Sequence, residues 1–132
     1  MPRRPHILQE LGFSVRQDGE ELHGTASVTP YMQVPGTTCL RASILASWAD
    51  MLLGLLSMRA FAGRVSVTLE LDVHLYRPAP GSGTVTAVAR QVKAGRSVFA
   101  GEVEFADASG EAFGFSAAHL AVEPVVGTAP QP

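Results

Sequence analysis

One carboxylate of this chain lies within a long apolar stretch. Asp50 follows Trp48 by two residues and directly precedes a Met-Leu-Leu triplet at 51–53. Removing an isolated charge from water among such neighbours is costly. A carboxylate in this position is therefore paired, protonated, or turned toward a cavity or an interface that holds water. These settings are typical of a functional acid. The alternative is a carboxylate that is hydrogen-bonded at a subunit interface and has no catalytic role.

The residues that open the same stretch form a second candidate site. Arg41 is a cation where a helix would begin, and it opposes the helix dipole by a few tenths of a kcal/mol unless an anion compensates. It could bind such an anion, or its stem could pack on apolar surface while its head reaches water. A pair with Asp50 is disfavoured, because nine helical residues rise about 13 Å. Ser43 offers a hydroxyl donor, or it simply caps the helix locally.

A group of basic side chains lies at predicted strand ends and turns in the second half of the chain. They are Arg77, Arg90, Lys93 and Arg96. Together they could hold phosphates by charge-assisted hydrogen bonds, whereas each one alone is more simply a solvated polar rim residue.

Composition excludes several other classes of site. The net charge of −2, from 10 basic and 12 acidic residues, does not provide the basic surface that binding to duplex nucleic acid requires. One cysteine excludes an intramolecular disulfide, and with four scattered histidines it provides no metal site. No signal peptide and no stretch long enough to span a bilayer is found, so we expect a cytoplasmic protein without a membrane partner.

One helix must position both candidate sites. Segment 39–59 has no proline, and Gly54 is its only weak helix former. It is apolar on nearly every face, which predicts burial by a surrounding sheet, by a partner subunit, or by both. Thr37 or Thr38 is expected to cap its first turn.

Strands are predicted around this helix, from alternating apolar residues and turn signals. The predicted strands are 13–17, 22–28, 65–76, 84–92, 98–107 and 112–122. In 65–76 the odd-numbered apolar residues are expected on one face and the even-numbered polar residues on the other. A short helix at 6–11 and a flexible tail at 123–132 complete the pattern, with one domain over 1–122. The predicted class is α+β, with an antiparallel sheet of about six strands wrapped around the helix.

This architecture and several motifs resemble the hot-dog fold, in particular the acyl-CoA thioesterases of the phenylacetate-degradation type. In that family the helix opens with His-Gly-Gly, and an acidic residue follows seven positions after the last glycine. Here Arg41-Ala42-Ser43 stands at the opening, Asp50 at the acidic position and Gly54 at a common small residue.

Further motifs in the loops and turns are also similar. Gln33-Val-Pro-Gly36 is similar to the family's Asn-x-x-Gly loop, although it lies two residues farther from the helix. The strand end Leu-Tyr-Arg-Pro-Ala at 75–79, the Gly95-Arg96 turn and the turn at 107–110 are similar to family motifs as well. The resemblance covers roughly residues 7 to 122.

The resemblance implies hydrolysis of an acyl-CoA thioester. Asp50 would be the general base or the nucleophile, and the backbone N–H of Ala42 would stabilise the oxyanion. Gln33 would position the water or the thioester oxygen, in the loop that contains Gly36. Trp48, with Met51, would form the floor of the acyl pocket.

The remaining expectations concern ligands and partners. Arg41 would bind an acyl carboxylate or a phosphate, and the four cations of the second half would bind the phosphates of coenzyme A. Coenzyme A is part of the substrate, and no cofactor or metal is implied. The family's dimers place active sites at their interface, so we expect a homodimer or a homotetramer.

Two alternatives remain open. A dehydratase or hydratase on the same fold would pair the acid with a histidine, and none lies in the loop or the first helical turns. A non-catalytic acyl-CoA-binding protein would fit the replacement of His-Gly-Gly by Arg41-Ala42-Ser43.

Overall fold

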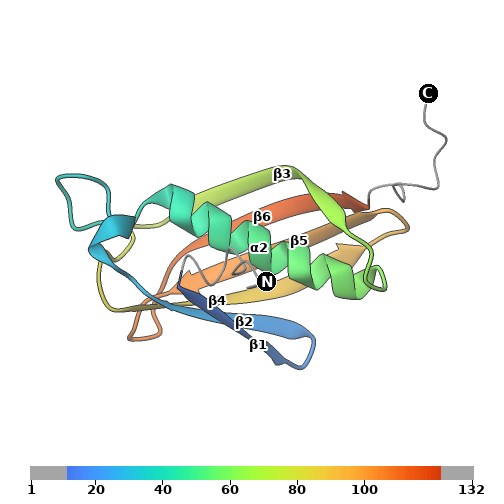
Figure 1. The fold of residues 1–132 in the computed structure, drawn as a ribbon, viewed down its shortest axis with the longest axis horizontal. Helices are drawn as coiled ribbons and strands as arrows, with labels where there is room; N and C mark the ends of the chain where they lie inside the picture. Colours follow the sequence, from blue (N-terminus) through green and yellow to red (C-terminus); the bar gives the residue numbers. More distant parts are fainter. Residues whose placement is uncertain (1–11, 123–132) are drawn as a thin grey trace, which may run out of the picture.

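The computed structural model describes residues 12–122, which form one sheet around one long helix (Figure 1). The strands are β1 Phe13–Asp18, β2 Glu21–Ser27, β3 Ser66–Leu75, β4 Thr84–Ala94, β5 Val98–Ala106 and β6 Ala112–Val122. The helices are the 3-10 turn η1 Pro30–Met32 and the long helix α2 Ala42–Ala60. The helix predicted at 6–11 and the tail predicted at 123–132 lie outside the described residues.

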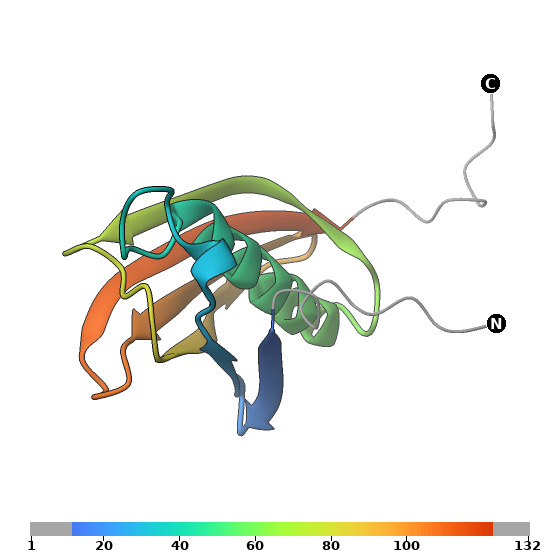
Figure 2. The same cartoon turned by 60° about the vertical axis from the view of Figure 1, so that its left-hand side comes forward.

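The sheet has the order β1-β2-β4-β5-β6-β3, and every neighbouring pair is antiparallel. It curls around α2, which packs against one face along its length (Figure 2). This confirms the predicted α+β architecture of six antiparallel strands around one helix. Among the described residues, no helix is long and apolar enough to cross a membrane.

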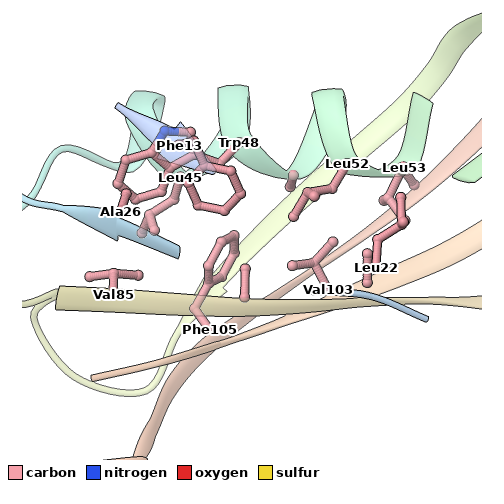
Figure 3. Packing of buried hydrophobic residues seen from close by; sticks show 14 of the residues in the cluster. Phe13, Leu22, Ala26, Leu45, Trp48, Leu52, Leu53, Val85, Val103 and Phe105 are labelled. Atoms are coloured by element: carbon pink, nitrogen blue, oxygen red, sulfur yellow. The ribbon is translucent and has the colours of Figure 1, made fainter. Parts of the chain in front are cut away.

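The core lies between α2 and the concave face of the sheet. In Figure 3 the helix side chains point toward Val85, Val103 and Phe105 of the sheet. Trp48 is fully buried there, and its ring stacks on Phe13 of β1 with centroids 4.8 Å apart. The expectation that Trp48 forms the floor of an acyl pocket is therefore wrong, because the first strand of the sheet covers its ring.

The long helix begins three residues later than predicted. Its N-cap is Arg41, which has extended backbone and makes no side-chain capping bond. Cys39 and Leu40 are held outside the helix, since Cys39 bridges to Pro80 and the Leu40 N–H donates to the Ala79 carbonyl at 3.1 Å. The predicted threonine cap is wrong for the same reason, because these bridges separate the threonines from the first turn.

Strand β3 contains a β-bulge that the sequence pattern does not predict. Thr68 and Glu70 pair with consecutive residues of β6, so that Leu69 is an extra residue without a partner. Successive side chains of a strand alternate between faces, and an extra residue exchanges the faces on either side of it. The unbroken alternation predicted over 65–76 is wrong for this reason.

The bulge turns hydroxyl groups toward the helix and apolar side chains away from it. Before the bulge, Thr68 faces α2, whereas Val67 and Leu69 are 40% and 62% exposed. After the bulge, Leu71 and Val73 pack against the core. Within residues 12–122, β3 is the last strand of the sheet and pairs with β6 alone, so these exposed apolar residues lie on a sheet edge, a surface that readily pairs with another chain.

Candidate active site

The carboxylate of Asp50 lies half-buried on the side of α2 that faces β3. The hydroxyl of Thr68 donates a hydrogen bond to its Oδ1 atom. Among the described residues no cation forms an ion pair with Asp50, and Oδ2 makes no hydrogen bond. The carboxylate also borders a pocket of about 160 Å³. One of its oxygens is thus held in place while the other is available to a water or a substrate.

Thr68 is a site residue that the sequence analysis misses. Strict alternation places it on the polar face directed away from the helix. It contacts Asp50 only because the bulge at Leu69 exchanges the faces of β3. A bulge depends on how a strand pairs with its neighbour, and the alternation within 65–76 contains no signal of it.

The start of α2 presents free backbone donors. The Ile44 and Leu45 N–H groups both donate to the Arg41 carbonyl. Ala42 and Ser43 precede them, and their N–H groups have no acceptor within the helix. Both residues are exposed. An anion or a developing oxyanion can reach this end of the helix, where the dipole favours negative charge.

Gln33 and Arg41 are fixed against each other at this end. The side-chain amide of Gln33 donates to the Gly81 carbonyl at 2.7 Å, and the Arg41 Nε donates to the Gln33 carbonyl at 2.9 Å. Gly36 occupies an exposed turn of the same loop with φ of +80°. The structure thus brings Gln33 and Arg41 together at the start of α2, with the amide of Gln33 engaged in holding the loop.

Within one chain, the helix start and the carboxylate are too far apart to act on one atom. Ala42 and Asp50 are eight residues apart on α2, which is a rise of about 12 Å. Catalytic hydrogen-bonding groups must approach the reacting atoms to about 3 Å. One carbonyl therefore cannot contact both groups of the same chain.

The four cations of the second half do not gather at one place within one chain. Arg77 lies beside the β5–β6 turn, where it pairs with Asp107. Lys93 lies in β4 beside the opposite end of β5, where it pairs with Ala100, and Arg96 follows in the β4–β5 turn there. The nine residues of β5 that separate the two ends span about 30 Å.

Two of these cations are already paired. Arg77 donates to Asp107 at 2.8 Å. Arg90 lies 3.4 Å from Glu21 and 3.5 Å from Glu102. Lys93 and Arg96 are exposed. A role of any of the four in binding coenzyme A stays a prediction.

The turn that holds Arg77 also contains a strongly perturbed acid. Hydrogen bonds from the Ser109 hydroxyl and from Arg77 lower the pKa of Asp107 from 3.8 to about 2, and the Glu111 and Ser109 N–H groups add to the effect. These bonds favour the ionised form, so their stabilisation is complete above the pKa of the unfolded chain. It is lost as the pH falls through about 2.

We expect Asp107→Asn to lower the free energy of unfolding at pH 7 and to have progressively less effect as the pH falls from about 4 to 2. Urea titrations followed by the fluorescence of Trp48, the single tryptophan, measure this. Glu104→Gln, at an exposed carboxylate of β5, is the matched control. An equal effect of Asp107→Asn at every pH would contradict the prediction.

No group of three or more histidine, cysteine, aspartate or glutamate side chains within residues 12–122 is arranged to hold a metal ion. The chemistry available at the sites described above is that of a carboxylate, a hydroxyl and backbone N–H donors.

Comparisons with known proteins identify related chains. A family model described as the thioesterase superfamily matches residues 42–113, which is 72 of the 132 residues. A search of the curated proteins gives no match.

Solved structures with the same fold include three bacterial proteins. The PaaI protein from the phenylacetic acid degradation operon of Escherichia coli is 18% identical, with a TM-score of 0.80 over 89% of this chain and 84% of that one. The thioesterase HI1161 of Haemophilus influenzae is 21% identical, with a TM-score of 0.83 over 94% and 87%. A mutant of the thioesterase PA1618 of Pseudomonas aeruginosa is 24% identical, with a TM-score of 0.81 over 90% and 86%. These likenesses confirm the hot-dog fold.

Proposed function

Because the chain belongs to the thioesterase superfamily and is a thioester hydrolase, we propose that it hydrolyses an acyl-CoA to the free acid and coenzyme A. The observation that carries this proposal is the carboxylate of Asp50. It lies within the matched segment, beside a pocket, with one oxygen held by Thr68 and the other available.

Asp50 acts on the thioester in one of two ways. As a general base it accepts a proton from water, and the resulting hydroxide attacks the carbonyl carbon. As a nucleophile it attacks that carbon itself, and water then hydrolyses the acyl–enzyme anhydride. In both cases the carbon–sulfur bond breaks and the thiolate of coenzyme A leaves. The hydrogen bond from Thr68 supports either role, because it orients the carboxylate without neutralising it by a cation.

The oxyanion that forms during this reaction requires a donor from a second copy of the chain. The helix rise of about 12 Å separates Ala42 from Asp50 in one chain. A partner whose helix start faces Asp50 supplies the missing N–H group. The open edge of β3, with Val67 and Leu69 exposed beside the Thr68 contact, supports pairing at this place. We therefore propose a homodimer with two composite sites, which can pair further into a tetramer.

The helix start also provides a site for the negatively charged parts of the substrate. Within residues 12–122, Nε is the only guanidinium atom of Arg41 that makes a hydrogen bond, and it donates to the Gln33 carbonyl. The rest of the guanidinium is available to a phosphate of coenzyme A or to a carboxylate on the acyl group. The exposed Lys93 and Arg96 are further candidates for the phosphates. No metal or redox cofactor takes part in this proposal.

A thiol-release assay tests the proposed function. The panel contains short, medium, long, aromatic and dicarboxylic acyl-CoAs. We expect turnover of one or more of them, and a preference for dicarboxylic substrates would assign a carboxylate to Arg41. A folded protein that releases thiol from none of these substrates would refute acyl-CoA hydrolysis. Binding of the same acyl-CoAs without turnover would then indicate a non-catalytic acyl-CoA-binding protein.

A further inference from the structure

Gly54 lies in the middle of α2 without a packing reason for a glycine. Glycine is less favourable than alanine in a helix interior. A Cβ atom at Gly24 would lie 2.0 Å from the ring of Phe13, and one at Gly101 would lie 2.7 Å from Leu53, so packing requires those two glycines. Apart from the backbone of α2 itself, a Cβ atom at Gly54 would meet no heavy atom of residues 12–122 within 4 Å. The helix therefore leaves space open at this position.

The open space lies next to the carboxylate of Asp50. Residues four apart on a helix share a face, so Gly54 lies one turn beyond Asp50 on the same side of α2. Both residues line the pocket of about 160 Å³. Its other lining residues are Met51, Leu55, Met58, Val65 and Ser66. Asp50 is thus the charged group of a pocket whose described lining is otherwise mostly apolar.

This apolar surface continues along the second half of the helix. Leu55 and Met58 also line a second hollow of about 440 Å³, together with Leu22, Gly63 and Arg59, the one charged residue of its described lining. From Asp50 to Met58 the helix rises by about 12 Å, which matches the length of a medium-length alkyl chain. A group attached to a thioester carbon at Asp50 can follow this surface over Gly54.

We propose that the acyl group of the substrate lies on this surface, that it is an uncharged apolar chain, and that Gly54 determines the size of the chain that is admitted. The inference rests on the proposed function, since reaction at Asp50 places one end of the acyl group there. Gly54 is then the first helix residue beyond the reacting carbon on the side of the acyl chain, where its missing side chain keeps the path open.

A graded series of substitutions at Gly54 tests this inference. Wild type, Gly54→Ala and Gly54→Leu are assayed for kcat/KM on straight-chain acyl-CoAs from acetyl to dodecanoyl. We expect Gly54→Leu to lower kcat/KM for the long chains by about 10- to 100-fold and to leave acetyl-CoA within about threefold of wild type. We expect Gly54→Ala to lower kcat/KM for the long chains as well, but by a smaller factor. Ala60→Leu, at the exposed last residue of α2, is the matched control and leaves the profile unchanged.

The possible outcomes separate this inference from the proposed function. A uniform loss on all chain lengths would overturn the inference, because it would place the arm of coenzyme A or a partner subunit over Gly54. An unchanged profile in Gly54→Leu would also overturn it. A preference for a dicarboxylic acyl-CoA over every straight-chain one would also overturn the inference, because the acyl group would then not be an uncharged apolar chain. A wild type that hydrolyses no acyl-CoA would overturn both proposals. If the activity is lost in Asp50→Asn but the Gly54 variants or the substrate panel give one of the three results above, this inference alone is overturned.

Discussion

Asp50→Asn is expected to lower kcat for acyl-CoA hydrolysis by about 10²- to 10⁴-fold, the range that a positioned acid–base group contributes. The amide cannot accept the proton of the attacking water, and it is a poor nucleophile. Its carbonyl oxygen can still accept the hydrogen bond that Thr68 donates to Oδ1 in the wild type. The fold and the binding of substrate should therefore be nearly unchanged. Steady-state kinetics on the best substrate of the panel measure the loss.

Asp72→Asn is the matched control for this substitution. Asp72 is an exposed aspartate of β3, and its side chain makes no hydrogen bond within the described part of the chain. It should retain full activity and an unchanged unfolding midpoint. If Asp50→Asn kept wild-type kcat while Asp72→Asn behaved as expected, the carboxylate of Asp50 would not be the reacting group. The site would then have to be sought at the start of the helix.

Ala42→Pro is expected to lower kcat by about 10²- to 10³-fold, the cost of removing one oxyanion donor. Proline lacks the backbone N–H, but it is favoured at the first position of a helix. Arg41 before it has φ of −67° and ψ of 137°, a conformation that suits the residue preceding a proline. The helix should therefore form normally. Ala42→Gly keeps the N–H and is the control expected to retain activity.

Mixing the two inactive variants distinguishes a composite site from a site within one chain. A heterodimer of Asp50→Asn with Ala42→Pro contains one site with both substitutions and one with neither. Random pairing of equal amounts should therefore restore about a quarter of wild-type activity. If each site lay within one chain, no intact site could form. Co-refolding the variants with different affinity tags and isolating the doubly tagged heterodimer makes the measurement. This fraction should have about half of wild-type activity, because one of its two sites is intact, and an inactive heterodimer would refute the composite site.

Much of the fold could be predicted from local sequence patterns. The strand predicted at 112–122 has the same bounds as β6, and the others agree to within one or two residues at each end. The absence of proline and the apolar faces of segment 39–59 correctly indicate a buried helix, but they place its start three residues too early. Helical propensity depends on neighbouring residues only, so it cannot account for the backbone hydrogen bonds that hold Cys39 and Leu40 to the segment around residue 80. Such bonds join parts of the chain some 40 residues apart, which a local pattern cannot represent.

Local patterns in the sequence define the secondary-structure elements and place one acid in a helix among apolar residues. Hydrophobic periodicity is a local property, so it determines where a strand or a helix forms and which residue types it contains. The contacts of Asp50, in contrast, depend on how the strands pair and pack. Pairing with β6 introduces the bulge at Leu69, and this exchanges the faces of β3 so that Thr68 faces Asp50. Packing likewise decided that the ring of Trp48 lies under Phe13 rather than in a pocket, because only the closed sheet brings β1 over the helix.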